Sequence, residues 1–282
     1  MLAKAQDSSA LDEGVGALAA ALIEIDPGIE GSRLGVWRIG HRIGSGGMAS
    51  VFLAERADGS YTQQAAIKIL RYGLYAGEER TRFVRERRIL AKLEHPHIAR
   101  LLDAGLTDAG VPWFALEYVK GQPITGWCDD HKLGIGARLQ LFSQACAAVD
   151  FSHRNLVVHR DLKPSNIFVR EDGVLKLLDF GIARLLDDND GEPTRTEARR
   201  LTPAYAAPEQ IHGQTITSAT DVFALGVVLH ELLTGCRPHW HEDGSLATPS
   251  SLITGNARES VAASPRPTAS RWWCSTARST RN

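Results

Sequence analysis

The fold of this chain is decided by the stretch His159-Arg160-Asp161-Leu162-Lys163-Pro164-Ser165-Asn166, which is followed by Asp179-Phe180-Gly181. These two motifs bring several reactive side chains into a short length of sequence. Asp161 is a candidate proton acceptor, and Lys163 is a cation suited to face a phosphate. Asn166 and Asp179 carry the amide and carboxylate oxygens that Mg²⁺ prefers as ligands.

The residues between the two motifs form a predicted β-hairpin. Ile167–Val169 and Val174–Leu178 are two short apolar runs, and Asp172-Gly173 between them is a strong turn signal. Antiparallel pairing of the runs brings their outer ends together. We therefore expect Asn166 and Asp179 to lie side by side.

These motifs resemble those of the eukaryotic-like protein kinases, specifically the serine/threonine branch found in bacteria. The resemblance extends from about Trp37 to about Arg237, and several independent motifs occur in the family order. It implies an α+β, two-lobed protein-kinase fold, in which a β-rich N-lobe carries one key helix and the C-lobe is mainly helical. We expect the N-lobe to span residues 34–118 and the C-lobe to span residues 119–237.

The resemblance also assigns roles to the residues of the two motifs. Asp161 orients the substrate hydroxyl and accepts its proton, while Lys163 steadies the transferred phosphoryl group. Asn166 and Asp179 hold Mg²⁺, for which Mn²⁺ is an alternative. Thr202 matches the threonine that bonds near the catalytic Asp and Lys in serine/threonine kinases. Lys163 favours the same branch, because tyrosine kinases usually lack a lysine at this place.

A glycine-rich segment upstream resembles the loop that covers ATP in this family, although a plain turn between two strands has the same pattern. Small residues let backbone N–H groups approach phosphate oxygens. Ala49 stands where the family usually has its third glycine, and its methyl group is expected to weaken closure over the nucleotide modestly. The predicted nucleotide contacts here are Ile43, Gly44, Ser45, Gly46, Gly47, Met48, Ala49, Ser50 and Val51.

Lys68 and Glu86 form the predicted ion pair of the N-lobe. Lys68 ends the alternating run Ala65-Ala66-Ile67-Lys68 and resembles the ATP-binding lysine of the family. Glu86 lies in an apolar stripe of the helix predicted over residues 78–93, and an unpaired buried carboxylate is costly. The resemblance supplies Lys68 as its partner, and the pair would aim this lysine at the α- and β-phosphates.

A buried strand predicted over Pro112–Val119 leads into the connector between the lobes. By resemblance, backbone groups around Glu117 and Val119 bond the adenine ring, and Leu116 guards the back of the pocket. A core strand without any ligand role fits the same side chains. Only the place of this strand in the order of motifs favours the connector.

A polar, threonine-bearing run lies between Asp179-Phe180-Gly181 and Ala207-Pro208-Glu209, where kinases have their activation segment. Thr194 and Thr196 in this run are candidate phosphosites, and Arg160 offers a cation to a phosphothreonine. We therefore expect autophosphorylation at one of these threonines, through self-association of two copies.

Composition defines only a broad class. The chain has 282 residues, 43% hydrophobic content and a net charge of −1, so it can bury a substantial core and offers no basic surface for nucleic acid. The stretch Val15–Ile25 is too short for a membrane span and contains Glu24. Four widely spaced cysteines indicate reduced thiols. We expect a cytoplasmic protein without a membrane segment or a nucleic-acid partner.

The end of the chain departs from the family pattern. An apolar helix predicted over Asp221–Leu233 resembles the central helix of the C-lobe, with Asp221 anchoring the catalytic loop. From Arg237 onward the sequence has six Arg, no Lys and many Ser, Thr and Pro residues. We expect a leader over residues 1–33, an incomplete C-lobe, and a disordered, atypical tail over residues 238–282 that arose by frameshift or truncation.

Together these expectations predict a protein serine/threonine kinase that transfers the ATP γ-phosphoryl group to protein hydroxyls, with ATP and Mg²⁺ as cofactors. Two alternatives remain. One is a nucleotide-binding but catalytically impaired kinase fragment that acts only as a binding module. The other is a small-molecule kinase of the same fold, against which the Ala207-Pro208-Glu209 segment argues.

Overall fold

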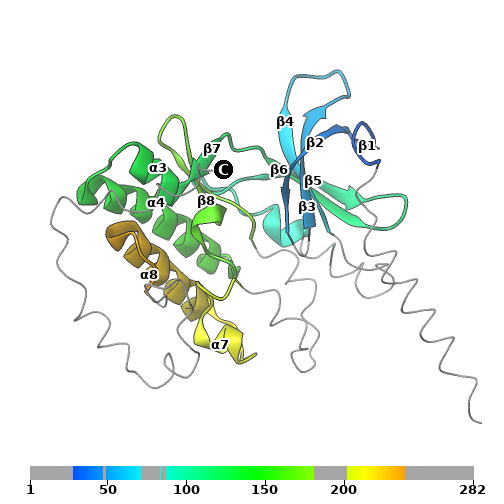
Figure 1. Cartoon of the computed structure of the whole chain (residues 1–282). Helices are drawn as coiled ribbons and strands as arrows, with labels where there is room; N and C mark the ends of the chain where they lie inside the picture. The colour runs from blue at the N-terminus through cyan, green and yellow to red at the C-terminus, as the bar shows by residue number, and fades with distance from the viewer. Residues whose placement is uncertain (1–27, 47–48, 71–82, 84–86, 181–201, 239–282) are drawn as a thin grey trace, which may run out of the picture.

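Two bodies make up the computed structural model, a β-sheet body and a mainly helical body (Figure 1). This arrangement agrees with the two-lobed α+β fold predicted from the sequence. The structure describes residues 28–46, 49–70, 83, 87–180 and 202–238. Several predicted features lie outside these residues: Gly47, Met48, Glu86, Thr194, Thr196, most of the leader, and the tail after Pro238.

Six antiparallel strands form the sheet body in the spatial order β1-β2-β3-β4-β6-β5. The order follows the chain except at one edge, where β6 lies between β4 and β5. The strands are β1 (Arg33–Leu34), β2 (Trp37–Ser45), β3 (Ala49–Arg56), β4 (Gln64–Leu70), β5 (Leu101–Leu106) and β6 (Pro112–Glu117).

Alternating side chains give the sheet one face that forms its own core. In β4, Ala65, Ile67 and Ile69 are buried, while the residues between them are partly exposed. These three side chains pack in one cluster with Trp37 of β2 and Trp113 of β6. The period of two in this strand is the pattern that the sequence shows before Lys68.

The other face of the sheet shares a core with the helical body. Phe83 meets Phe114 of β6 edge-on, with 5.2 Å between the ring centroids. Leu90 and Leu93 are buried in the same cluster, which continues to Leu175 in the helical body. Residues 83 and 87–90 are helical, so the apolar stripe predicted for the N-lobe helix is confirmed at its described positions.

In its described residues the helical body has four α-helices and a small sheet with the order β7-β8-β9. The long helices α4 and α8 pack against each other (Figure 1). No helix in the described part of the chain is long and apolar enough to cross a membrane. The elements are β7 (Gly121–Pro123), α3 (Ile124–Asp130), α4 (Ile135–Arg154), the 3₁₀ turn η1 (Pro164–Asn166), β8 (Ile167–Arg170), β9 (Leu175–Leu177), α7 (Pro208–Ile211) and α8 (Ser218–Thr234).

Helix α8 is buried along one side only. Its first turn is capped by the Thr217 hydroxyl, which accepts the Ala219 N–H at 3.3 Å, and it ends at Gly235 with φ +74°, a left-handed conformation that favours glycine. Val228 is fully buried, whereas Val222 on the opposite side is 62% exposed. The predicted helix over 221–233 is therefore confirmed, with an apolar residue facing solvent.

The sheet begins slightly before the predicted N-lobe boundary at residue 34. Arg33 of β1 pairs with Arg38 of β2. Gly31 N–H donates to Ile39 O at 2.8 Å, and Ile39 N–H donates to Ser32 O at 2.9 Å. Residues 31–33, which we assigned to the leader, thus form part of the edge of the sheet.

Candidate active site

A β-hairpin leads to the predicted metal-binding residues. β8 pairs with β9 in antiparallel fashion, with Ile167 opposite Leu177. Gly173 adopts φ +79° in the turn, and the Asp172 carboxylate accepts the Val174 N–H at 3.2 Å. The hairpin predicted from Asp172-Gly173 is confirmed.

Asn166 and Asp179 lie at the open end of this hairpin. The Leu178 N–H donates to Asn166 O at 2.8 Å, which continues the strand pairing by one residue. Asp179 follows directly, so its carboxylate and the Asn166 amide belong to the same end of the hairpin. Among the described residues no cluster of three or more His, Cys, Asp or Glu side chains forms a ready-made metal site.

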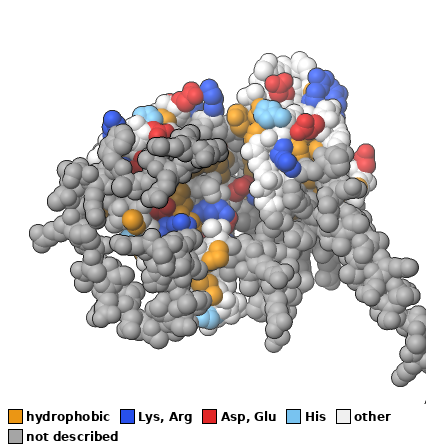
Figure 2. All heavy atoms as spheres, viewed as in Figure 1, with side chains coloured by type: hydrophobic (Ala, Val, Ile, Leu, Met, Phe, Trp, Pro, Cys, Tyr) orange, Lys and Arg blue, Asp and Glu red, His pale blue; other side chains and the backbone are white. Residues whose placement is uncertain are grey.

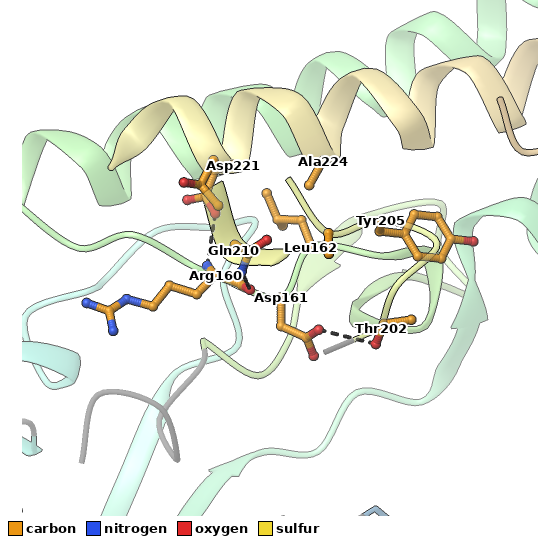
Figure 3. Close-up of a pocket in the computed structure, with 10 residues that line it drawn as sticks. Arg160, Asp161, Leu162, Thr202, Tyr205, Gln210, Asp221 and Ala224 are labelled. Atoms are coloured by element: carbon orange, nitrogen blue, oxygen red, sulfur yellow. Dashed lines mark hydrogen bonds between the residues drawn. The ribbon is translucent and has the colours of Figure 1, made fainter. Parts of the chain in front are cut away.

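The Asp161 carboxylate is bound by three neighbouring side chains. Its Oδ2 atom is 2.9 Å from Lys163 Nζ and accepts the Asn166 Nδ2–H at 3.1 Å. Its Oδ1 atom is 3.5 Å from the Thr202 hydroxyl, as drawn in Figure 3. Lys163 Nζ also donates to Thr202 Oγ1 at 2.9 Å, so Asp161, Lys163 and Thr202 form a closed triangle.

This triangle is open to solvent. The side chain of Asp161 is 26% exposed and that of Lys163 is 24% exposed. Both charged groups are therefore accessible from solvent.

Asp221 at the start of α8 fixes the backbone that carries Asp161 (Figure 3). Its carboxylate is 1% exposed and accepts the N–H groups of His159 at 2.7 Å and Arg160 at 2.9 Å, and the Nε2–H of His153 at 2.8 Å. Burial alone would raise the pKa of Asp221, but the bonds from His153 and the two amides lower it overall. The predicted anchoring role of Asp221 agrees with these contacts.

His159 is a fully buried neutral link inside the same loop. Its Nε2–H donates to Leu178 O at 2.8 Å, which leaves Nδ1 as an acceptor, and its ring lies 4.7 Å from the Phe180 ring. Burial lowers the pKa of His159, against the opposing charge of Asp221 and the bond to Leu178. The imidazole therefore joins the two motifs of the site through one hydrogen bond and one ring contact.

Two residues of the site hold backbone angles that are unusual for side chains with a Cβ. Arg160 has φ +67° and Asp179 has φ +49°. Gln210 of α7 donates to Arg160 O at 2.9 Å, and Arg160 N–H donates to Asp221. Both backbone polar groups of Arg160 are therefore hydrogen-bonded. Such conformations cost of order 1–3 kcal/mol each and persist only where surrounding contacts impose them.

Lys68 of β4 binds the second motif directly. Its Nζ lies 3.0 Å from Asp179 Oδ1, and its side chain is 13% exposed. We predicted Glu86 as its partner, but Glu86 lies outside the described residues, and that pairing stays a prediction. The pair brings a lysine of the sheet body to a carboxylate of the helical body.

The glycine-rich segment is an ordinary strand pair at its described positions. Gly44 pairs with Val51 and Ser45 with Ser50, and Gly46 N–H donates to Ala49 O at 2.9 Å. Ile43 is 41% exposed. Both Ala49 and Ser50 are buried, and the Ala49 methyl belongs to the main core cluster. This burial gives no support to the expectation that the methyl group hinders closure over a nucleotide.

The connector strand presents its side chains to the protein and not to open space. Val119 is 9% exposed. The Glu117 N–H donates to Arg100 O at 2.8 Å, and the Glu117 carboxylate is 2.9 Å from Lys176 Nζ. Leu116 lines a cavity of about 20 Å³ together with Leu90 and Phe180, and its place at the back of an adenine pocket stays a prediction.

Charged groups gather where the two bodies meet. Figure 2 shows basic and acidic side chains in the hollow between the sheet body and the helical body. Two ion pairs, Lys68–Asp179 and Lys163–Asp161, contribute charges of both signs to the site. The arrangement suits an anionic ligand that brings its own cation.

Two short hydrogen bonds connect the segment after Thr202 to α8. Tyr205 OH donates to Glu231 at 2.6 Å, and the Thr220 hydroxyl donates to Glu209 at 2.6 Å. Burial, and then the bond to Glu231, raises the pKa of Tyr205, so its phenol stays protonated. Helix α8 therefore positions both this segment and the Asp161 loop.

Sequence reasoning missed Lys176 of β9. It lies within the apolar run Val174–Leu178 and is only 7% exposed. The available signal was the charge itself, because a lysine inside a buried strand requires an anionic or carbonyl partner. No rule of spacing identifies that partner, since Glu117 is 59 positions away in the sequence.

Comparison with known proteins identifies the family. The protein kinase domain family matches residues 37–271. The chain belongs to this family. The match extends beyond Arg237, where we expected the kinase domain to end. The described fold is accordingly the two-lobed fold of a protein kinase domain.

The curated relatives are bacterial kinases of greater length. The probable serine/threonine-protein kinase PknB of Bifidobacterium longum is 35% identical over 234 residues, which are 76% of this chain and 32% of the relative. The serine/threonine-protein kinase pkn3 of Myxococcus xanthus is 37% identical over 211 residues, which are 72% of this chain and 38% of the relative. The chain thus spans about a third of the length of these relatives.

A solved structure supports the same family. The kinase domain of Mycobacterium tuberculosis PknI superposes with a TM-score of 0.57 at 29% identity, over 74% of this chain and 76% of that one. The protein kinase fold is therefore supported by both sequence and structure.

Proposed function

We propose that this chain transfers the γ-phosphoryl group of ATP to serine and threonine hydroxyls of proteins. The observation that carries the proposal is the closed contact set of Asp161, Lys163 and Thr202. It joins an exposed carboxylate to a lysine and to a hydroxyl from the segment after the activation loop. The serine/threonine kinase names of the relatives support the same activity.

One oxygen of Asp161 is better suited than the other to receive a proton. Oδ2 already interacts with Lys163 and Asn166, at 2.9 and 3.1 Å. Among the described residues, Oδ1 has one contact, the 3.5 Å approach of the Thr202 hydroxyl, which is long for an O–H···O bond. We assign Oδ1 as the atom that orients the substrate hydroxyl and accepts its proton, while Lys163 stays beside the transferred group.

The residues around the hollow fit a nucleotide with its metal ion. A methyl group built on Gly46 would meet no heavy atom of the described residues within 4 Å, so this backbone faces open space. Lys68 would contact phosphate oxygens, and Asn166 and Asp179 would hold Mg²⁺ or Mn²⁺. When bound, the ion neutralises charge on the phosphates during transfer. The connector backbone around Glu117 and Val119 would bind the adenine ring.

The activity is tested with the full chain, [γ-³²P]ATP, MgCl₂ and dephosphorylated casein. We expect label on casein as phosphoserine and phosphothreonine, with none on tyrosine, and loss of label when EDTA replaces MgCl₂. Binding of ATP without any label on casein or on the chain would favour the catalytically impaired binding module instead.

Regulation of this activity is proposed to act through Thr194 or Thr196. Phosphate at either residue would add negative charge near Arg160, which precedes Asp161. Peptide mass spectrometry after incubation with ATP and MgCl₂ locates the phosphate, and an initial rate that rises with the square of protein concentration indicates reaction between two copies.

We also propose a cytoplasmic setting, which rests on the widely spaced cysteines and the need for ATP.

A further inference from the structure

A buried lysine connects the strand before Asp179 with the connector. Lys176 of β9 is 7% exposed, and its Nζ donates to Glu117 Oε2 at 2.9 Å and to Ile98 O at 3.4 Å. A buried ammonium group requires such partners, because removal of one of them leaves an uncompensated charge. The contact is therefore a specific link and not a surface ion pair.

The Glu117 side chain is oriented by more than the lysine. Its carboxylate accepts the Arg100 N–H at 3.3 Å, and its own N–H donates to Arg100 O at 2.8 Å. Glu117 ends β6, where the chain leaves the sheet body for the connector. Its carboxylate thus faces the segment before β5, while its backbone belongs to the proposed adenine site.

The backbone of β9 is bound to the same segment. Leu177 N–H donates to His97 O at 2.8 Å, and Ala99 N–H donates to Leu177 O at 2.9 Å. The Leu175 carbonyl lies 3.1 Å from His97 Nδ1. Residues 97–100 therefore lie between β9 and the end of β6, and the Lys176–Glu117 pair closes this junction with side chains.

We propose that Lys176 and Glu117 form a positioning pair that couples the adenine site of the connector to the metal ligand Asp179. This inference rests on the proposed function. Lys176 precedes Asp179 by three residues, on strand β9, which ends at Leu177, and Glu117 is the last residue of β6 before the connector. Neither side chain contacts Asp161 or Lys163 in the structure, so the pair acts through the backbone.

The consequence concerns how much Mg²⁺ improves nucleotide binding. With the pair intact, a nucleotide held at the connector and an ion held at Asp179 are at a fixed separation, so each favours the other. Without the pair, β9 and the connector can shift relative to each other. Binding of nucleotide alone then changes little, while its enhancement by Mg²⁺ falls, since coupling between two sites is reciprocal.

The test measures the ADP affinity of the full chain by calorimetry, once with MgCl₂ and once with EDTA. The Mg²⁺ ratio is the affinity with MgCl₂ divided by the affinity with EDTA. For Lys176→Met and Glu117→Gln we expect this ratio to fall about fivefold or more, the lower range of ordinary coupling between sites. Lys120→Met is the matched control, because Lys120 forms a 3.0 Å pair with Glu171 in which both side chains are more than 70% exposed. Its ratio should equal that of the unmodified chain.

The double variant Lys176→Met/Glu117→Gln separates positioning from stability. It leaves no unpaired buried charge, so its melting temperature should recover relative to the single variants, while its Mg²⁺ ratio should stay low. An unchanged ratio in Lys176→Met, or a ratio that recovers together with the melting temperature, overturns the inference. If the unmodified chain does not label casein but its ADP affinity still rises with Mg²⁺, only the proposed function is overturned. ADP binding does not require phosphoryl transfer.

Discussion

The catalytic loop and the glycine-rich segment belong to one proposed site, but they are held in different ways. The loop, residues 159–166, is fixed by side chains from distant elements, chiefly Asp221 and Gln210. The glycine-rich segment, described at residues 43–46 and 49–51, is fixed by the backbone pairing of β2 with β3 and by the bond from Gly46 N–H to Ala49 O.

This difference determines how each region should respond to mutation. A backbone ladder survives the loss of one side chain, because every residue contributes its own N–H and C=O groups. A loop that depends on one carboxylate loses several bonds when that carboxylate changes, and one of its residues, Arg160, already holds a strained angle. Single substitutions should therefore be severe in the loop and mild in the strand pair.

The largest effect is expected at the reacting carboxylate. Asp161→Asn removes the proton acceptor but keeps the shape, so casein labelling should fall by about 10²–10⁴-fold, the usual contribution of general base catalysis. ADP affinity and melting temperature should stay close to those of the unmodified chain. Asp150→Asn is the control, since Asp150 forms an exposed pair with Arg154 on α4. Undiminished labelling by Asp161→Asn would remove this residue from the mechanism.

Next in size is the loss of the carboxylate that anchors the loop. Asp221→Asn places an amide against the N–H groups of His159 and Arg160, and breaking a buried charged contact costs about 3–5 kcal/mol. Urea denaturation at pH 7.5 measures this loss. The pKa of Asp221 is lowered, so its contribution is fully present above about pH 4 and is lost as the pH falls further.

The result for Asp221 bears directly on the comparison. If Asp221→Asn were as stable as Asp150→Asn, the loop would be held by its own backbone and would resemble the glycine-rich segment. A stable variant with lowered transfer would instead mean that Asp221 shapes the loop without supporting the fold.

A smaller effect is expected from His159. Burial keeps this imidazole neutral and lowers its pKa, whereas in the unfolded chain it binds a proton near pH 6.5. The folded state is therefore favoured above about pH 6.5 and loses stability as the pH falls below it. His159→Phe should flatten this part of the stability curve between pH 7.5 and 5.5. His95 contributes to the slope that remains, because its pKa is lowered by burial and then by His97 and Lys176.

Much of the fold could be predicted because it is encoded locally. Asp172-Gly173 defines the β8–β9 turn, and the helix predicted over Asp221–Leu233 lies within α8. The reactive residues of the loop are likewise adjacent in sequence, so their proximity follows from short-range geometry. The family motifs then supplied Thr202, which contacts Lys163 from a distant segment.

The parts that sequence could not predict depend on contacts between remote residues. Lys68 and Asp179 meet across the two bodies, and no spacing rule pairs them. Lys176 selects Glu117 only because residues 97–100 bring β9 beside the end of β6. The positive φ of Arg160 is held by tertiary bonds from Asp221 and Gln210, since arginine does not favour that conformation.

The smallest effect is expected in the strand pair, at Ala49. Its methyl group is buried in the main core cluster opposite Leu70, so Ala49→Gly should cost about 1 kcal/mol through lost burial and added chain freedom. ADP affinity should not change, because the methyl is already covered by the protein side chains of this cluster. Ala54→Gly, at another buried position of β3, is the matched control and should show a similar loss of stability. A change of ADP affinity in Ala49→Gly alone would mean that this methyl acts on the nucleotide after all. The function of the glycine-rich segment would then depend on a side chain, as that of the catalytic loop does. The two regions would no longer differ at Ala49, where the family usually has glycine.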